Sequence, residues 1–358
     1  MKIEDSKIHE KHDVRTEKIF DTVGMLPHRY VYLLTNRCNL TCDFCFQDTS
    51  KPEIIMTAED WINVTDQLPP NSRITLTGGE PLLFSEFEKV FKYVAERFEC
   101  NMITNGIPLT KEIIDMLLSF NNFKVLAISI DNIKNTIRGV SEKSWAKMEE
   151  MLHYFIQMRN EREIDCNLDI KTIILEENSG ELFEIYKYCV EKLHCDTFAY
   201  QFLKGAPLHH ANNVYNFDDI LSKYEAPVYK RFDIIREQLE LVRKYNVENG
   251  KKAFLHPKIG SLTSNEPLPD LNYFNVSGHV KEDFLPCKFP SSSVHINYDS
   301  RLIPCMAISL GSVKEKTLAE IFDGDVYKEF MKIIRTEGTV PGCNHCGWLR
   351  PAEELLCS

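Results

Sequence analysis

Three cysteines lie within eight residues of one another, at positions 38, 42 and 45. At this spacing all three thiolates can converge on one compact inorganic group. Cysteine thiolates hold iron–sulfur clusters, and a [4Fe-4S] cluster ordinarily takes four of them. The next cysteine, Cys100, lies far along the chain. We therefore expect one iron without a protein ligand, and an open coordination position is typical of a catalytic metal site.

The composition narrows the class of protein. The chain has 358 residues, of which 43% are hydrophobic and 27% charged, which is typical of a large globular domain with a smaller one. The net charge of −11 argues against a nucleic-acid partner. Residues 1–20 contain neither a signal peptide nor an apolar span, so we expect a cytoplasmic protein without a membrane partner. In that reducing compartment the 12 cysteines would be metal ligands and buried thiols.

Apolar stretches of strand length alternate with helical patterns between residues 28 and 203. The predicted strands are 30–34, 73–77, 101–104, 124–130, 168–175 and 197–202. The predicted helices are 58–67, 85–98 capped by Ser85, 110–120 capped by Thr110, 144–159 and 181–193. This alternation predicts an α/β fold, a partial (β/α)6 TIM-type barrel with its chemistry at the C-terminal ends of the strands. The cysteine loop follows the first of these strands.

The pattern divides the chain into four segments. Residues 1–27 form an N-terminal leader, and residues 28–203 form the barrel. Residues 204–285 break the alternation, with a predicted helix at 232–245, and would cover part of a substrate pocket. Residues 286–358 form a small α+β domain with predicted strands at 294–297 and 301–304 and a helix at 318–322.

Two motifs together resemble the radical S-adenosylmethionine (radical SAM) enzymes. The cysteine loop follows the first strand, and Thr77-Gly78-Gly79-Glu80-Pro81 follows the second. The resemblance implies that Cys38, Cys42 and Cys45 bind three irons of a [4Fe-4S] cluster, whose fourth iron is chelated by S-adenosylmethionine. Reductive cleavage would give methionine and a 5′-deoxyadenosyl radical, which abstracts a substrate hydrogen atom. A zinc knuckle is the alternative, although structural zinc prefers four ligands.

The resemblance also implies roles for residues near the cosubstrate. Gly78 and Gly79 would let the backbone approach the ligand closely, and Glu80 would accept a hydrogen bond from the ammonium group. Phe44 would offer an apolar face near the adenine. Each of these positions also has an ordinary structural reading, such as a tight turn after a strand.

Polar residues after the fourth and fifth strands match further positions of the family. Ser129, followed by Asp131, resembles the ribose-contacting motif, and Arg138 resembles an arginine that meets the cosubstrate carboxylate. Asn178 would reach the adenine side. Ser129 and Asp131 could instead stabilise the strand end, and Arg138 could be a solvated surface residue.

A second set of cysteines lies near the C-terminal end: Cys287, Cys305, Cys343 and Cys346. Four ligands make a closed site. The pattern resembles the twitch domain, the short relative of the SPASM extension, which holds one auxiliary [4Fe-4S] cluster. The chain departs from that family at a hairpin turn, where Asp299-Ser300 replaces the usual glycine. A zinc ribbon is the alternative, because the spacing serves either metal.

The leading hypothesis is a radical SAM oxidoreductase that acts on a small hydroxylated metabolite, such as a sugar or an aminocyclitol. The auxiliary cluster would accept the substrate electron, and flavodoxin or ferredoxin would supply the reducing electron. One alternative is a maturase that crosslinks, oxidises or epimerises a ribosomally made peptide, although such relatives often carry a leader-recognition domain larger than this N-terminal segment. Others are a non-redox radical epimerase or isomerase and a non-catalytic metal-binding scaffold.

Overall fold

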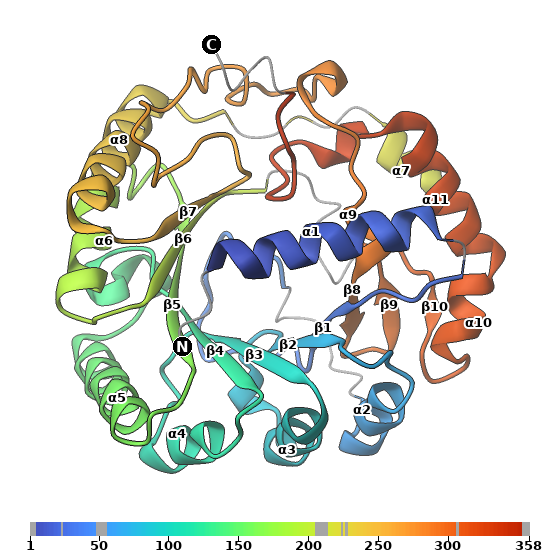
Figure 1. Ribbon diagram of the computed structural model, residues 1–358, viewed down its shortest axis with the longest axis horizontal. Helices are drawn as coiled ribbons and strands as arrows, with labels where there is room; N and C mark the ends of the chain where they lie inside the picture. Colours follow the sequence, from blue (N-terminus) through green and yellow to red (C-terminus); the bar gives the residue numbers. More distant parts are fainter. Residues whose placement is uncertain are drawn as a thin grey trace.

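The computed structural model describes residues 5–22, 24–47, 56–204, 214–222, 225, 228–305 and 308–352. One sheet runs through this part of the chain, with the strand order β10-β9-β8-β1-β2-β3-β4-β5-β6-β7 (Figure 1). The sheet curves, and helices line its outer side. The predicted α/β fold with a parallel sheet is confirmed.

The centre of the sheet is the predicted parallel array. Its strands are β1 (Arg29–Leu33), β2 (Arg73–Thr77), β3 (Glu99–Thr104), β4 (Phe123–Ser129), β5 (Asn167–Ile174) and β6 (Thr197–Phe202). The connecting helices are α2 (Ala58–Thr65), α3 (Phe87–Arg97), α4 (Lys111–Leu118), α5 (Glu142–Glu161) and α6 (Leu182–Glu191). Parallel strands covered on both faces are rich in apolar residues, as in β4, and this is why the sequence located them well.

The predicted helix caps agree with the structure at one position and not at the other. The Thr110 side chain accepts a hydrogen bond from the backbone N–H of Ile113, so this cap is confirmed. The prediction for Ser85 is wrong, because α3 has Glu86 at its N-cap position and no side-chain cap. The Glu86 carboxylate instead accepts from the backbone N–H of Ala58, at the start of α2 (3.0 Å).

The sheet continues beyond the six predicted barrel strands on both sides. After α7 (Phe217–Leu221) and α8 (Phe232–Asn249), β7 (Ala253–His256) pairs in parallel with β6. On the other side α9 (Phe289–Ser292) leads into β8 (Ser293–Asn297), which pairs in parallel with β1. The antiparallel strands β9 (Arg301–Ile303) and β10 (Gly311–Ser312) follow. The segment after residue 203 and the C-terminal domain therefore both add strands to the barrel sheet.

Two long helices were not predicted. The leader forms α1 (Asp5–Asp21), which packs beside α9 (Figure 1) and donates from Thr16 Oγ1 to Ser292 Oγ (2.8 Å). Few apolar residues lie along it, so the sequence carried no helical periodicity. After α10 (Leu318–Asp323), α11 (Asp325–Glu337) has a clear apolar face, with Phe330 and Ile334 buried one turn apart.

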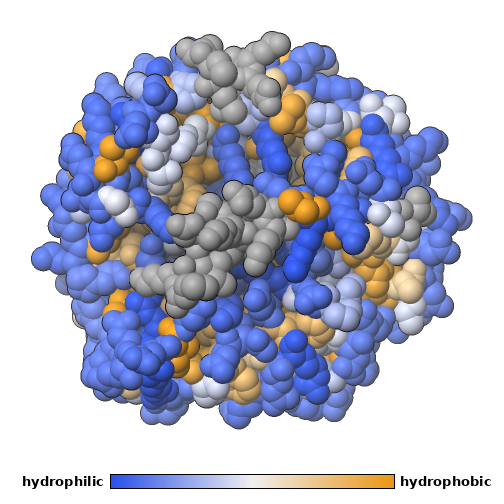
Figure 2. Space-filling model, in the orientation of Figure 1, coloured by the Kyte–Doolittle hydropathy of each residue, from blue (hydrophilic) through white to orange (hydrophobic). Residues whose placement is uncertain are grey.

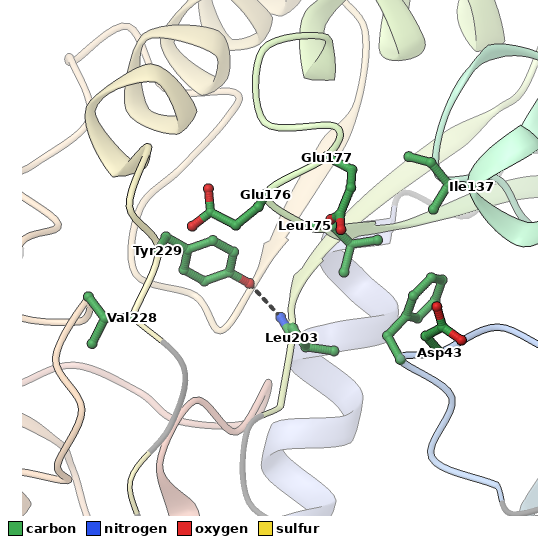
Figure 3. Close-up of a pocket in the computed structure, with 9 residues that line it drawn as sticks. Asp43, Ile137, Leu175, Glu176, Glu177, Leu203, Val228 and Tyr229 are labelled. Carbon is green, nitrogen blue, oxygen red and sulfur yellow. Dashed lines mark hydrogen bonds between the residues drawn. The ribbon is translucent and has the colours of Figure 1, made fainter.

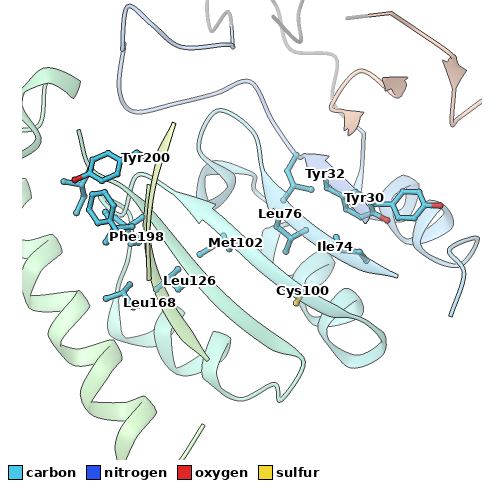
Figure 4. Packing of buried hydrophobic residues seen from close by; sticks show 14 of the residues in the cluster. Tyr30, Tyr32, Ile74, Leu76, Cys100, Met102, Leu126, Leu168, Phe198 and Tyr200 are labelled. Carbon is cyan, nitrogen blue, oxygen red and sulfur yellow. The ribbon is translucent and has the colours of Figure 1, made fainter. Parts of the chain in front are cut away.

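The core lies between the sheet and the helices and on the concave side of the sheet. Side chains of neighbouring strands stack across the sheet in Figure 4, including Ile74, Leu76, Met102, Leu126, Leu168, Phe198 and Tyr200. The face of the molecule in Figure 2 is mostly hydrophilic, with scattered apolar side chains, in line with the net charge of −11. None of the described helices combines the length and the apolar character that a membrane-spanning helix requires.

Candidate functional site

The cysteine loop lies at the C-terminal end of β1, where a parallel barrel places its chemistry. Cys38, Cys42 and Cys45 are partly exposed. Backbone N–H groups point at two of the sulfurs: Leu40 N lies 3.4 Å from Cys38 Sγ, and Gln47 N lies 3.4 Å from Cys45 Sγ. Such donors favour thiolate ligands of an iron–sulfur cluster. The described residues contain no group of three or more His, Cys, Asp or Glu placed to hold a single metal ion.

The surroundings of the cysteine loop have opposing effects on the pKa values of its thiols. Burial raises the pKa of the Cys42 thiol, and the guanidinium of Arg138 opposes this shift. The other two thiols raise the same pKa, because their charges would repel that of Cys42. Burial also raises the pKa of Cys45, again opposed by Arg138. A cluster binds the deprotonated form, so Arg138 is placed to stabilise a cluster-bound loop.

The two glycines after β2 lie directly against the backbone of the cysteine loop. Gly79 N donates to Thr35 O (2.7 Å), and Glu80 N donates to Arg37 O (2.8 Å). A Cβ on Gly79 would lie 2.3 Å from Arg37 O, and one on Gly78 would lie 2.5 Å from Thr35 O. Gly78 also has a φ of +143°, which favours glycine. We expected the backbone of Gly78 and Gly79 to approach a ligand closely. In the structure this backbone lies close to the loop that carries the cysteines.

Glu80 is fully buried and hydrogen-bonded within the protein. Its Oε1 accepts from Thr104 Oγ1 (2.8 Å) and from Leu82 N (3.2 Å), and its Oε2 accepts from Asn105 N (2.9 Å). Burial raises its pKa to about 7, and the three hydrogen bonds limit the shift. The carboxylate thus ties the turn after β2 to the end of β3. The expected contact with a cosubstrate ammonium stays a prediction.

Asn105 is a site residue that the sequence analysis missed. It follows β3, and its Nδ2 lies 3.7 Å from Cys38 Sγ and 2.8 Å from Asn39 Oδ1. Ends of neighbouring parallel strands meet at one edge of the sheet, so a polar residue after β3 belongs beside the loop after β1 and the turn after β2. This rule about strand ends could have identified Asn105 as a site residue from the sequence.

Arg138 is held between the fourth strand end and the cysteine loop. Its Nε lies 2.6 Å from Asp131 Oδ2, and its Cζ lies 5.3 Å from the centre of the Phe44 ring. Asp131 is fully buried and accepts from Ile173 N (2.7 Å). Burial raises the Asp131 pKa, and Arg138 opposes that shift. The ion pair with Asp131 is made through Nε, and a contact of Arg138 with a cosubstrate carboxylate stays a prediction.

Ser129 and Asn178 differ in their accessibility. Ser129 is the last residue of β4 and is partly exposed, and its carbonyl accepts from Asn135 Nδ2 (2.9 Å). Asn178 is fully buried, and its amide donates to Asp131 O and to Ile173 O, both at 2.8 Å. The amide of Asn178 therefore stabilises the strand ends, and the expectation that it reaches an adenine is not supported.

A cavity of about 450 Å³ opens beside Phe44 (Figure 3). Its other lining residues come from the cysteine loop, from the turn after β4, from the ends of β5 and β6 and from the segment before α8: Asp43, Ile137, Leu175, Glu176, Glu177, Leu203, Val228 and Tyr229. The Tyr229 hydroxyl accepts from Leu203 N (2.8 Å) and donates to Ile174 O (2.9 Å), which fixes one wall. The cavity and the cysteine loop thus share the C-terminal edge of the sheet.

The four C-terminal cysteines influence one another electrostatically. Burial raises the pKa of Cys305, and the neighbouring thiols of Cys343, Cys287 and Cys346 raise it further. Burial and the Cys346 thiol raise the pKa of Cys287 to about 12. At the hairpin turn Ser300 has a φ of +72°, so this serine adopts the conformation that glycine would take more easily. The turn therefore forms here with serine at a backbone conformation that favours glycine.

His345 links the C-terminal cysteine turn to the cavity wall. It lies between Cys343 and Cys346 and is 1% exposed. Its Nε2 lies 3.0 Å from Phe274 O, and its ring stacks on Phe274 at 4.7 Å between centroids. The other stacked neighbour is Tyr229, at 6.4 Å, which lines the cavity. One aromatic layer therefore separates the cavity from the turn that carries Cys343 and Cys346.

Two family models match the chain in the order that the motifs predicted. Residues 32–189 match the radical SAM superfamily, and residues 287–347 match SPASM, an iron–sulfur cluster-binding domain. A radical SAM domain implies a [4Fe-4S] cluster and S-adenosylmethionine, and a SPASM domain implies auxiliary iron–sulfur binding. The predicted barrel and the predicted C-terminal domain are therefore confirmed as domain types.

Curated relatives match part of the chain. The sporulation killing factor maturation protein SkfB of Bacillus subtilis is 29% identical over 168 residues, which cover 46% of this chain and 40% of SkfB. The antilisterial bacteriocin subtilosin biosynthesis protein AlbA of the same species is 29% identical over 117 residues, which cover 31% of this chain and 26% of AlbA. The chain thus matches less than half the length of each.

A solved structure matches nearly the whole fold. SuiB of Streptococcus suis, crystallised with the precursor peptide SuiA, superposes with a TM-score of 0.59. The superposition covers 91% of this chain and 71% of SuiB, at 15% sequence identity. At this identity the likeness shows the shared fold.

We predict that Gly79→Ala prevents assembly of the N-terminal cluster. The new Cβ would lie 2.3 Å from Arg37 O, so the cysteine loop must move. Overpacking of this kind costs about 1–3 kcal/mol, measurable by urea unfolding of the metal-free protein. Gly278→Ala is the matched control, because a Cβ there meets nothing within 4 Å. Normal iron content together with unchanged stability in Gly79→Ala would show that the contact is unimportant.

We also predict a pH-dependent contribution of Glu80 to the stability of the metal-free protein. Its folded pKa of about 7 lies above the ordinary value of 4.5, so between these values the folded state keeps a proton that the unfolded state loses. The free energy of unfolding should therefore fall as pH rises from about 4.5 to about 7, by up to a few kcal/mol. Glu80→Gln should flatten this slope in urea titrations, whereas the exposed Glu88→Gln should keep it. Equal slopes in all three proteins would contradict the shift.

Proposed function

We propose, from the premise that the chain belongs to the radical SAM superfamily and carries a SPASM domain, that it is an enzyme that modifies a ribosomally made peptide. The observation that carries the catalytic part is a convergence at one edge of the sheet. The cysteine loop, the Gly-Gly-Glu turn and a cavity of about 450 Å³ meet there. A radical formed at the cysteine loop would therefore face a cavity of the size that substrates need.

The choice of a peptide revises the leading hypothesis from the sequence. The names of two relatives refer to the maturation of a killing factor and to the biosynthesis of a bacteriocin, and the solved SuiB binds a precursor peptide. These findings favour a peptide over a small hydroxylated metabolite. The length of the N-terminal segment is not evidence in either direction.

The residues of the cysteine loop fit an iron–sulfur cluster. We propose Cys38, Cys42 and Cys45 as its ligands, because backbone donors point at two of their sulfurs and Arg138 opposes the rise in two of their pKa values. When bound, the cluster and S-adenosylmethionine would supply one-electron reductive cleavage of the cosubstrate. Gly78, Gly79 and Glu80, by their contacts with the loop, would hold the ligands in place for that step.

We propose that Phe44, Ser129 and Arg138 border the cosubstrate. Phe44 lines the cavity, and the guanidinium of Arg138 stacks above its ring. An apolar ring on which an adenine can lie, next to a cation that suits a carboxylate, matches the two ends of S-adenosylmethionine. Ser129, at the end of β4, would meet the ribose.

The charge of the cavity indicates what kind of substrate group it accepts. Three carboxylates, Asp43, Glu176 and Glu177, line it, and among its described lining residues there is no lysine, arginine or histidine. Leu175, Leu203 and other apolar side chains form the remaining wall. A neutral or positively charged side chain of a peptide would therefore be preferred over an acidic one.

The C-terminal cysteines complete the proposal. Cys287, Cys305, Cys343 and Cys346 would hold an auxiliary [4Fe-4S] cluster with four protein ligands, leaving no position for a second cosubstrate. His345 and Tyr229 place their turn directly behind the cavity wall. This closeness supports electron transfer from the substrate to the auxiliary cluster, and hence a net oxidation. An external low-potential protein, such as a flavodoxin or ferredoxin, would reduce the first cluster.

We predict that Cys42→Ala abolishes the formation of 5′-deoxyadenosine from S-adenosylmethionine under strong anaerobic reduction. The variant lacks one of only three proposed cluster ligands, so the loss should be at least about a hundredfold by chromatography. Cys305→Ala is the control. Cys305 is a proposed ligand of the auxiliary cluster, so cleavage of S-adenosylmethionine should persist in this variant. If Cys42→Ala still cleaves the cosubstrate at the normal rate, the proposed site is wrong.

A further inference from the structure

We infer that Asn105 is a positioning residue that makes the N-terminal cluster easier to reduce, by donating a hydrogen bond to the sulfur of Cys38. The inference rests on the proposed function, because it takes Cys38 as a cluster ligand. Asn105 belongs to neither motif from which the family was recognised. It enters the site from a third strand, β3, whose end is hydrogen-bonded to Glu80 in the turn after β2.

The geometry identifies which end of the Asn105 amide faces the cysteine loop. Ile107 N donates to Asn105 Oδ1 (3.0 Å), and a backbone N–H cannot accept, so this end of the amide is the oxygen. The NH₂ group therefore points the other way. It lies 3.7 Å from Cys38 Sγ and 2.8 Å from Asn39 Oδ1. The two hydrogens of one amide can serve these two acceptors.

The surroundings hold Asn105 in this orientation. The residue is 6% exposed, and its backbone N–H donates to Glu80 Oε2 (2.9 Å). Glu80 is itself fully buried and fixed by Thr104 and Leu82. The amide cannot turn away without losing its bond to Ile107, so it presents its N–H groups to the sulfur before any cluster is present. A side chain held in this way is pre-organised for a ligand.

The physical effect follows from the charge that reduction adds. A [4Fe-4S] cluster takes up one electron from a low-potential one-electron donor, and part of the added charge resides on its thiolate ligands. A hydrogen bond to such a sulfur stabilises the reduced form and raises the reduction potential. Leu40 N supplies one donor to Cys38, and Asn105 supplies a second that comes from another strand. Loss of the second donor should therefore make reduction harder without removing a ligand.

The test is a reductive titration of the complete, anaerobically reconstituted protein, followed by electron paramagnetic resonance. The signal that changes when S-adenosylmethionine is added reports the N-terminal cluster. Asn105→Leu keeps the approximate size of the side chain and removes the donor. At a potential where half of the unaltered cluster is reduced, the ratio of reduced to oxidised cluster should fall at least threefold, a shift of about −28 mV at 59 mV per tenfold change.

Two further variants separate this effect from simple packing. Asn122→Leu makes the same substitution at an asparagine before β4, whose amide donates to Ala95 O (2.9 Å) away from the cysteine loop, and should leave the potential unchanged. Asn105→Asp keeps the shape and the bond from Ile107 but places a carboxylate beside the sulfur, so its potential should fall at least as far as that of Asn105→Leu. If Asn105→Leu fails to assemble the cluster, Asn105→Ala, which removes the same donor without adding a charge, is titrated in its place.

An unchanged potential in Asn105→Leu or its replacement Asn105→Ala, with normal iron content, would overturn the inference and leave the proposed function standing. An equal shift in Asn122→Leu would overturn it too, because the effect would then come from a general disturbance of the fold. If the unaltered protein shows no signal that responds to S-adenosylmethionine, the proposed function itself fails. The two failures are therefore distinguishable.

Discussion

The site depends on one backbone contact, in which the Gly78-Gly79 turn lies against the first residues of the cysteine loop. No side chain can be inserted there, because a Cβ on Gly79 would lie 2.3 Å from Arg37 O. The contact fixes where the loop leaves β1, and hence where Cys38 begins. Glu80 then extends the same network to β3, and Asn105 returns from β3 to the sulfur of Cys38. Three strand ends thus position one ligand.

The second site is built on the same sheet as the first. β8 pairs in parallel with β1, so the hairpin between Cys287 and Cys305 is anchored directly to the strand that carries the cysteine loop. The later turn, with Cys343 and Cys346, packs through His345 against Phe274 and against Tyr229 of the cavity wall. The cavity borders the cysteine loop through Asp43 and Phe44 and the C-terminal cysteine turn through Tyr229, which suits a reaction in which an electron enters at one site and leaves at the other.

The sequence was sufficient to predict the architecture and which residues belong to the site. It was not sufficient to predict the contacts that these residues make. Strands buried on both faces are rich in apolar residues, and the six barrel strands were located within two residues. The sequence did not predict β7, because this strand has four residues and precedes Pro257. It did not predict α1, because this helix is polar on nearly every side. Motif position placed Glu80 and Arg138 in the site. Their hydrogen-bond and ion-pair partners, Thr104 and Asp131, depend on tertiary packing that no local pattern records.

Iron, sulfide and zinc analysis of the anaerobically reconstituted protein tests the central claim, that two cysteine sets hold two [4Fe-4S] clusters, most directly. About eight irons and eight sulfides per chain are expected, because each set would carry one such cluster. About four irons per chain would contradict the proposed auxiliary cluster. Stoichiometric zinc with little iron would contradict the radical chemistry as a whole.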